Sequence, residues 1–150
     1  MTLKLVLTVG NGMMGDDAAG PLLAQKMSQA PIENWKIIDG GSCPENYIFQ
    51  IRELAPERVL VVDSADMDLS PGEIRFIGNQ RLEDPFFITT HSLPLSYLVD
   101  SICEFVPRVD LIGIQPAVVA FGYPISESVK QAVDIVYENL KKEVLPWSTL

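Results

Sequence analysis

The sequence predicts an α/β fold, a three-layer α/β/α sandwich around a twisted, mostly parallel five-stranded sheet. Nearly continuous apolar runs, such as RVLVVD at residues 58–63, are typical of strands that are buried on both faces. These runs alternate with segments whose apolar residues recur at helical spacing, which favours a parallel sheet with helices on both sides. The 150 residues contain no repeat and no linker, so we expect one domain over residues 1–150.

The first half of the chain contains three strand patterns and two helix patterns. Residues 3–9 form an apolar run bounded by glycine, and residues 19–30 follow with apolar side chains on one helical face. Residues 35–39 form a short strand that ends at an aspartate, and residues 45–54 resume the helical spacing. Residues 58–63 are the clearest strand, because their apolar residues are all valine or leucine.

The second half of the chain contains two further strands and two further helices. Residues 72–77 alternate between apolar and polar, as an edge strand with one wet face does, and residues 108–116 form a strand that ends at a proline. Residues 93–105 form a helical stripe, and this places Cys103 in the core. Residues 126–144 form the last helix, for which Ser126 is a suitable N-cap.

The balance of charge excludes two classes of partner. The formal net charge is -9 at pH 7, whereas nucleic acids and anionic membrane surfaces attract an excess of basic residues. The first apolar run ends at Gly10, which is too short for a transmembrane helix, and no signal-peptide cleavage site follows. We therefore expect a cytoplasmic protein without a nucleic-acid or membrane partner.

The segment VGNGMMGDDAAGP, residues 9–21, supports two opposite functions. Its glycines have the spacing of a dinucleotide-binding loop, and Asp39 ends the next strand where a ribose-binding carboxylate is expected. However, Asp16 and Asp17 come directly after these glycines, where they would repel a phosphate at the start of a helix. The two carboxylates suit a bound cation better, or they cap the helix.

Acidic residues follow three of the expected strands, and the only histidine ends the run FFITTH. The carboxyl ends of parallel strands meet at one edge of a sheet, so Asp17 and Asp63 are expected close together. If the segment before His91 runs with the same polarity, its imidazole completes a three-ligand metal site with open positions. The alternatives are a structural histidine, and an acid–base pair formed by Asp17 and Asp63.

Six blocks of sequence occur in a fixed order: GNGMMGDDAAGPLLA, IDGGS, VVDSADM, PGEIR, TTHSLPL and LIGIQP. Together they cover roughly residues 3–140 and resemble the nickel–iron hydrogenase maturation endopeptidases. Within that family they are similar to the branch that acts on hydrogenase 3 of the formate hydrogenlyase system.

The resemblance implies an endopeptidase that removes the C-terminal peptide from the nickel-loaded precursor of a [NiFe] hydrogenase large subunit. It implies that Ni2+ arrives with this partner, so no permanently bound cofactor is expected. It further implies that the substrate nickel is recognised by two carboxylates and one histidine, namely Asp17, Asp63 and His91. The resemblance also places a substrate loop beside these ligands, with the residues Gly40, Gly41 and Asp16.

The catalytic role of the metal stays open at this point. The nickel either polarises the scissile carbonyl and activates water, or it serves recognition alone while Asp17 or Asp39 acts as the base toward water in an aspartic-type reaction. A nickel-sensing chaperone or binding module is the alternative function, and a Rossmann-like dinucleotide-binding protein is a second one. We expect the protein to act as a monomer.

Overall fold

The computed structural model describes residues 2–78 and 95–150, and these residues build a sheet in the order β2-β1-β3-β5-β4. Its three central strands and one edge strand run parallel, whereas β4 at the other edge runs antiparallel to β5. The strands are β1 (Lys4–Thr8), β2 (Trp35–Asp39), β3 (Arg58–Ser64), β4 (Ile74–Phe76) and β5 (Arg108–Ile114).

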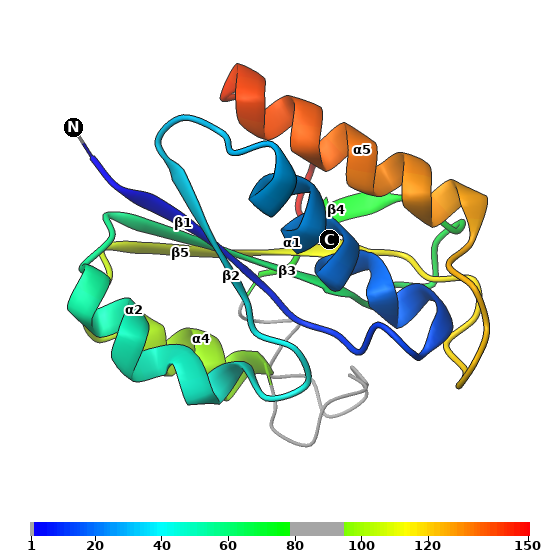
Figure 1. The fold of residues 1–150 in the computed structure, drawn as a ribbon, viewed down its shortest axis with the longest axis horizontal. Helices are drawn as coiled ribbons and strands as arrows, with labels where there is room; N and C mark the ends of the chain where they lie inside the picture. The colour runs from blue at the N-terminus through cyan, green and yellow to red at the C-terminus, as the bar shows by residue number, and fades with distance from the viewer. Residues whose placement is uncertain (1, 79–94) are drawn as a thin grey trace.

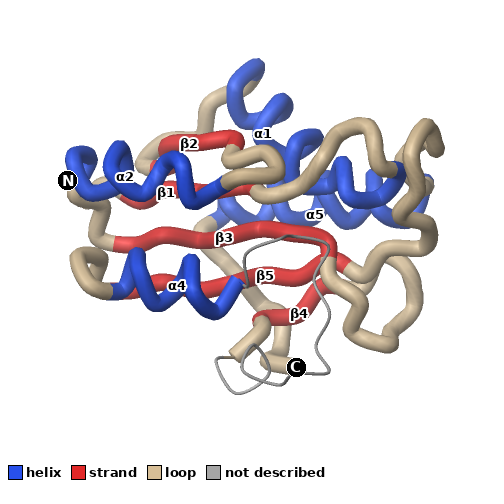
Figure 2. The backbone as a smooth tube through the Cα atoms, turned by 90° about the horizontal axis from the view of Figure 1, so that it is seen from below, coloured by secondary structure: helices blue, strands red, loops and turns tan. Residues whose placement is uncertain are grey.

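Helices cover both faces of this sheet (Figures 1 and 2). One face carries α1 (Ala19–Gln29) and α5 (Glu127–Lys142), and the other carries α2 (Ile48–Leu54) and α4 (Leu95–Cys103). Short 3-10 turns, η1 (Gly15–Ala18) and η2 (Pro44–Tyr47), lead into α1 and α2. The predicted three-layer α/β/α fold with a mostly parallel sheet is therefore confirmed.

Strand β3 shows why the sheet needs helices on both sides. Val59 and Val61 pack into the apolar cluster under α2 and α4, whereas Leu60 and Val62 pack into the cluster under α1 and α5. All four side chains are fully buried. Burial of such a side chain contributes about 1.5–3 kcal/mol, so a central strand of this composition stabilises both outer layers at once.

The predicted elements differ from the observed ones mainly at their ends. Helix α2 begins at Ile48, because residues 44–47 form the tighter 3-10 turn. The predicted strand over 108–116 ends at Ile114, since the side chain of Gln115 turns to accept a hydrogen bond from the amide of Met67. The prediction that Cys103 lies in the core is wrong: its neighbour Ile102 is buried and the cysteine is exposed.

The helices of the described ranges are short. The longest, α5, has 16 residues and one strongly polar face. No helix within residues 2–78 and 95–150 has the length and apolar composition that a bilayer span requires.

Candidate functional site

The carboxyl ends of three parallel strands meet at one edge of the sheet. Thr8 at the end of β1 is in register with Asp39 at the end of β2 and with Val62 near the end of β3. The loops that follow these strands therefore start side by side, as expected for the ligand-binding edge of an open α/β sheet. Two of the predicted site residues, Asp39 and Asp63, belong to these strand ends.

Asp17 reaches this edge from the turn η1, and hydrogen bonds from Asn11 and Ser64 help to hold it there. The amide of Asn11 donates to its Oδ2 atom over 2.8 Å, and the hydroxyl of Ser64 donates to its Oδ1 atom over 2.9 Å. Ser64 directly follows Asp63 in β3, so the structure brings Asp17 to the strand end that carries Asp63. Both aspartates are buried, with exposed fractions of 3% for Asp17 and 0% for Asp63.

Asp16 lies next to Asp17 but turns toward a different part of the chain. Its carboxylate is fully buried and accepts four hydrogen bonds from the loop of residues 115–126. The donors are the amide of Ala117 (2.8 Å), the amide of Val118 (3.0 Å), and the amide (2.6 Å) and hydroxyl (2.7 Å) of Ser126. Asp16 thus joins the loop before α1 to the loop before α5.

These hydrogen bonds also set the ionisation of Asp16. Burial alone would raise the pKa of its carboxyl group, but the donors on Ser126, Val118 and Ala117 favour the charged form and hold the pKa below its ordinary value. Ser126 does occupy the N-cap position of α5, as predicted, yet it makes no side-chain capping bond. Its hydroxyl donates to Asp16 instead, and in that respect the capping prediction is wrong.

The glycine turn after β2 is fastened to the loop that carries Asp17. The amide of Gly40 donates to the carbonyl of Thr8 over 2.7 Å, and the amide of Gly10 donates to the carbonyl of Gly41 over 2.9 Å. Asp39 is exposed, and its Oδ1 atom accepts a hydrogen bond from the amide of Gly41 over 3.1 Å. The structure therefore places Asp39, Gly40 and Gly41 next to the segment that leads to Asp17.

The third predicted nickel ligand, His91, lies outside the described residues. Within residues 2–78 and 95–150, no three or more His, Cys, Asp or Glu side chains are grouped so that they could hold a metal ion. The three-ligand site therefore stays a prediction, of which the structure describes the two carboxylates.

The amides at the start of η1 bear on the alternative that the glycine loop binds a phosphate. The amide of Asp16 donates to the carbonyl of Val118 over 2.8 Å, and the amide of Asp17 donates to the carbonyl of Met14 over 3.2 Å. A dinucleotide-binding loop presents such amides to the pyrophosphate instead. Together with the two buried carboxylates, this arrangement favours a cation over an anion at the site.

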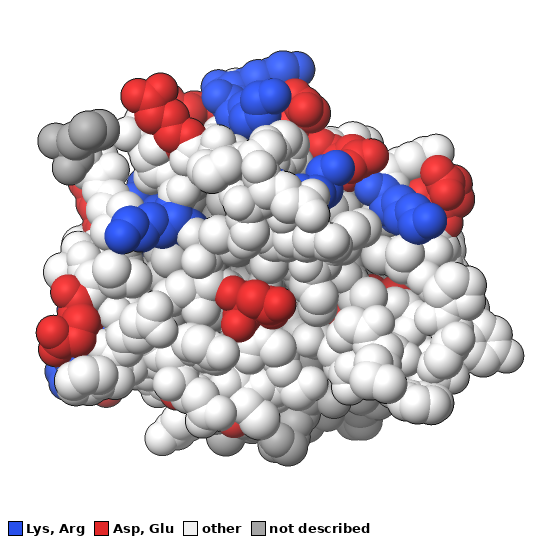
Figure 3. Space-filling view, viewed as in Figure 1, with Lys and Arg blue, Asp and Glu red and all other residues white. Residues whose placement is uncertain are grey.

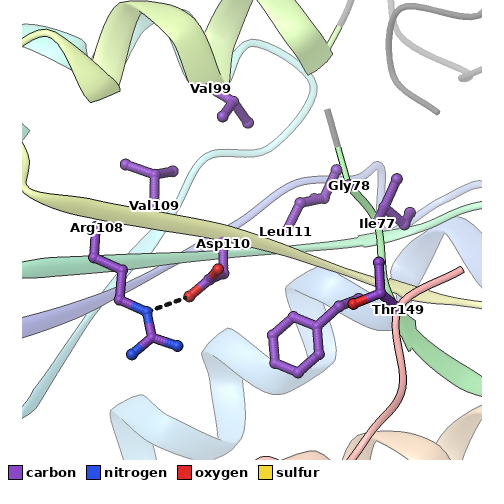
Figure 4. A pocket seen from close by; sticks show the side chains of 9 residues that line it. Ile77, Gly78, Val99, Arg108, Val109, Asp110, Leu111 and Thr149 are labelled. Carbon is purple, nitrogen blue, oxygen red and sulfur yellow. Dashed lines mark hydrogen bonds and ion pairs between the residues drawn. The ribbon is translucent and has the colours of Figure 1, made fainter. Parts of the chain in front are cut away.

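A cavity in the described part of the chain lies away from this edge. It has a volume of about 350 Å³ and is formed by the first half of β5, Val99 of α4, the end of β4 and Thr149 (Figure 4). Inside it, the Nε atom of Arg108 donates to Asp110 over 3.0 Å. Arg108 pairs with Arg58 at the amino end of the parallel strands, so this cavity is at the opposite end from Asp63.

Sequence reasoning missed two residues that organise the site. Ser64 orients Asp17, and the only signal for it is its place directly after Asp63 at a strand end. Val118 is joined to Asp16 through both its amide and its carbonyl, and no spacing or composition in the sequence indicates a partner so far along the chain.

Comparisons with known proteins agree on one family. The family described as hydrogenase maturation protease matches residues 21–143. The chain is 53% identical over 137 residues to the hydrogenase 3 maturation protease of Escherichia coli (strain K12), covering 91% of this chain and 88% of that protein. It is 31% identical over 145 residues to a putative hydrogenase maturation protease of Methanocaldococcus jannaschii, covering 91% and 85%.

Solved structures give the same result. A crystal structure of the hydrogenase 3 maturation protease superposes with a TM-score of 0.92 at 48% identity, covering 99% of this chain and 97% of that one. A crystal structure of a [NiFe] hydrogenase maturation protease from Thermococcus kodakarensis superposes with a TM-score of 0.83 at 26% identity, covering 94% and 91%.

Proposed function

Because this chain belongs to the hydrogenase maturation protease family, we propose that it removes the C-terminal peptide from the nickel-loaded precursor of a [NiFe] hydrogenase large subunit. Membership makes the protein a peptidase, and the family predicted from the six sequence blocks is confirmed. The 53% identity to a hydrogenase 3 maturation protease supports a substrate of the hydrogenase 3 type.

The substrate nickel is bound by Asp17, Asp63 and His91 in this proposal. The observation that carries it is that two buried aspartates from separate segments, Asp17 of η1 and Asp63 of β3, lie at the same strand end, because a cation between two buried carboxylates would offset their mutual repulsion. The donors on Asn11 and Ser64 fix the orientation of the Asp17 carboxylate, as hydrogen bonds to a metal-ligating carboxylate do. His91 enters on the sequence alone, as an imidazole suited to Ni2+.

The base toward water is Asp17 or Asp39, and the geometry supports Asp39. Its side chain is exposed and therefore open to water, whereas that of Asp17 is buried. Water would attack the scissile carbonyl and give a proton to this base. The protonated base would then give that proton to the departing amine. Nickel binding would hold the bond in place for this attack.

Gly40 and Gly41 form the substrate loop beside this base. Their amides and carbonyls are joined to the segment around Gly10, so a peptide lying on the loop is held at a fixed distance from Asp17. Asp16 supports this substrate loop without touching the substrate, because its carboxylate is fully buried. It fixes the backbone that the substrate would meet.

The protein is further proposed to act as a cytoplasmic monomer. Its only proposed macromolecular partner is the large-subunit precursor, because a net charge of -9 disfavours contact with nucleic acid or an anionic membrane. The nickel comes with the precursor, and no permanently bound cofactor is proposed.

The test is to incubate nickel-loaded and nickel-free precursor with the protein and to measure the mass of the large subunit. Loss of a C-terminal peptide from the loaded form alone is the expected result. Asp17→Asn and His91→Ala proteins should leave the loaded precursor intact. The matched control is Asp66→Asn, which removes an exposed carboxylate two residues after the end of β3.

Two outcomes would contradict parts of the proposal separately. If the wild-type protein binds the loaded precursor but the tail stays on, the protein is a nickel-sensing binding module. If loaded and nickel-free precursors lose the tail at equal rates, the peptidase stands and nickel recognition by Asp17, Asp63 and His91 is wrong.

A further inference from the structure

Four large apolar side chains are exposed on the two loops that Asp16 joins. Their exposed fractions are 61% for Met13, 40% for Val118, 71% for Phe121 and 59% for Tyr123. Single exposed apolar residues are ordinary on a protein surface, but a contiguous group of them marks an interaction site. We call these four residues the apolar loop patch.

The residues of the patch lie on loops that are bonded to each other. The amide of Gly122 donates to the carbonyl of Met13 over 2.9 Å, and the amide of Asp16 donates to the carbonyl of Val118 over 2.8 Å. The loop before α1 and the loop before α5 lie at the same end of the molecule in Figures 1 and 2. The patch is therefore continuous across two segments that are about 100 residues apart in sequence.

The two segments that carry the patch contain no charged residues. Residues 5–15 and 111–126 contain no Asp, Glu, Lys or Arg, although charged residues make up 21% of the chain. Figure 3 shows a broad area without charged side chains at the lower right, on the side where these loops lie. An uncharged apolar patch suits a partner that has an apolar surface of its own. The net charge of the protein, -9, would not attract such a partner.

We propose that the apolar loop patch docks the folded precursor protein whose nickel Asp17 binds, a proposal that rests on the proposed function. The patch is continuous with that site: Met13 is four residues before Asp17, and Val118 is bonded directly to Asp16. A protein that presents its metal to Asp17 therefore covers these loops. A second copy of the chain on the patch would instead block that approach.

Asp16 gives this docking surface a fixed distance from the nickel ligand. Its four hydrogen bonds hold Val118 and Ser126 against the same turn that carries Asp17. A precursor bound on the patch is thereby positioned over Asp17 without a conformational change in either loop, which lowers the entropic cost of bringing the scissile bond to the base.

The test compares the two aromatic patch residues with equally exposed aromatic residues elsewhere. Phe121→Ala is paired with Phe49→Ala, since both phenylalanines are 71% exposed, and Tyr123→Ala (59%) is paired with Tyr97→Ala (60%). The control residues lie on α2 and α4. The measurements are the Kd for nickel-loaded precursor by biolayer interferometry, and KM and kcat for tail removal by mass spectrometry.

The patch variants should raise Kd and KM about tenfold or more and leave kcat within about twofold, because an exposed aromatic residue in an interface contributes to binding rather than to the chemical step. The control variants should leave all three constants within about twofold of wild type. Binding should also change little between about 50 mM and about 500 mM NaCl, since apolar contacts are not screened by salt.

Docking on the patch is wrong if Phe121→Ala and Tyr123→Ala bind the precursor as the controls do, or if the wild type does not bind it. It is also wrong if light scattering shows a wild-type dimer that Phe121→Ala converts to a monomer with faster tail removal. If the wild type binds but does not remove the tail, the proposed function fails, and the Kd comparison still decides the docking proposal.

Discussion

Asp16 and Ser126 are 110 residues apart in sequence and are joined by two short hydrogen bonds, from the serine amide over 2.6 Å and from its hydroxyl over 2.7 Å. Together with the bonds from Ala117 and Val118, they make one buried carboxylate the connection between the loops before α1 and α5. The neighbouring carboxylate of Asp17 points to Asn11 and Ser64 instead. Two adjacent aspartates thus have separate partners: Asp16 joins two loops, and Asp17 bonds to the strand end that carries Asp63.

The structural task of Asp16 predicts a large loss of stability on substitution. Asp16→Asn replaces one acceptor oxygen by an amide donor and leaves buried backbone amides without an acceptor, so the free energy of unfolding should fall by about 2–4 kcal/mol. Urea denaturation at pH 7 measures this. The control is Asp134→Asn, which removes an ion pair with Lys26. The Asp134 side chain is 60% exposed, so this change should lower the free energy of unfolding by no more than about 1 kcal/mol.

The depressed pKa of Asp16 predicts how this stability depends on pH. The folded-state pKa lies below the ordinary value of 3.8, so the unfolded chain binds a proton first as the pH falls. The stability that Asp16 contributes is therefore complete well above 3.8 and is lost as the pH falls through the folded-state pKa. The difference in unfolding free energy between wild type and Asp16→Asn should stay constant at neutral pH and narrow in acid. If the difference in unfolding free energy between the two proteins does not narrow in acid, the native hydrogen bonds do not favour the ionised form of Asp16.

Ser64 is predicted to act as a positioning residue for Asp17. Ser64→Ala removes the hydroxyl that donates to Asp17 Oδ1, so the carboxylate loses its fixed orientation and tail removal should slow by about tenfold. Ser101→Ala is the control, because its hydroxyl donates to a carbonyl within α4, away from the site. If Ser64 had a structural role alone, Ser64→Ala would lower the melting temperature and leave the KM for nickel-loaded precursor, the concentration that half-saturates the enzyme, unchanged. An increase in this KM would show that Ser64 positions the Asp17 carboxylate for the precursor.

Two of the three glycines of the G-x-G-x-x-G segment, Gly10 and Gly15, are predicted to serve chain packing, whereas Gly12 is predicted to be replaceable. A Cβ atom on Gly15 would lie 2.6 Å from the carbonyl oxygen of Val118, at a φ of +59°, so Gly15→Ala should destabilise the protein by about 2 kcal/mol or more. A Cβ atom on Gly12 would meet only Pro21, at 3.9 Å, and Gly12→Ala should stay within about 1 kcal/mol of wild type.

Tail removal by the Gly12→Ala protein checks the same idea through function. A dinucleotide-binding loop needs glycine at the middle position so that the backbone can approach the pyrophosphate. In this structure a Cβ atom on Gly12 meets no atom closer than 3.9 Å, so Gly12 should be replaceable. Unchanged processing by Gly12→Ala is expected. A loss of activity with a normal melting temperature would reopen the phosphate interpretation.

Hydrophobic periodicity was sufficient for the sheet and its helices. The strand at Trp35–Asp39 was predicted with its observed ends, and the last helix differs from its predicted span of 126–144 by two residues or fewer at each end. The reason is local: residues that face a buried layer must be apolar at every second, or every third and fourth, position. The parallel order of the strands then brings Asp39 and Asp63 to one edge, which the sequence also indicated.

Only the tertiary structure decided which partners the two adjacent aspartates have. Their identical chemistry and neighbouring places in the chain give no sign of which one turns inward, because the partners of Asp16 lie 101 to 110 residues further on. The same holds for Ser126, whose position favours a helix cap but whose hydroxyl binds Asp16. Local pattern determines which residues form each element, whereas hydrogen bonds between loops depend on how the elements pack, and that is a property of the whole chain.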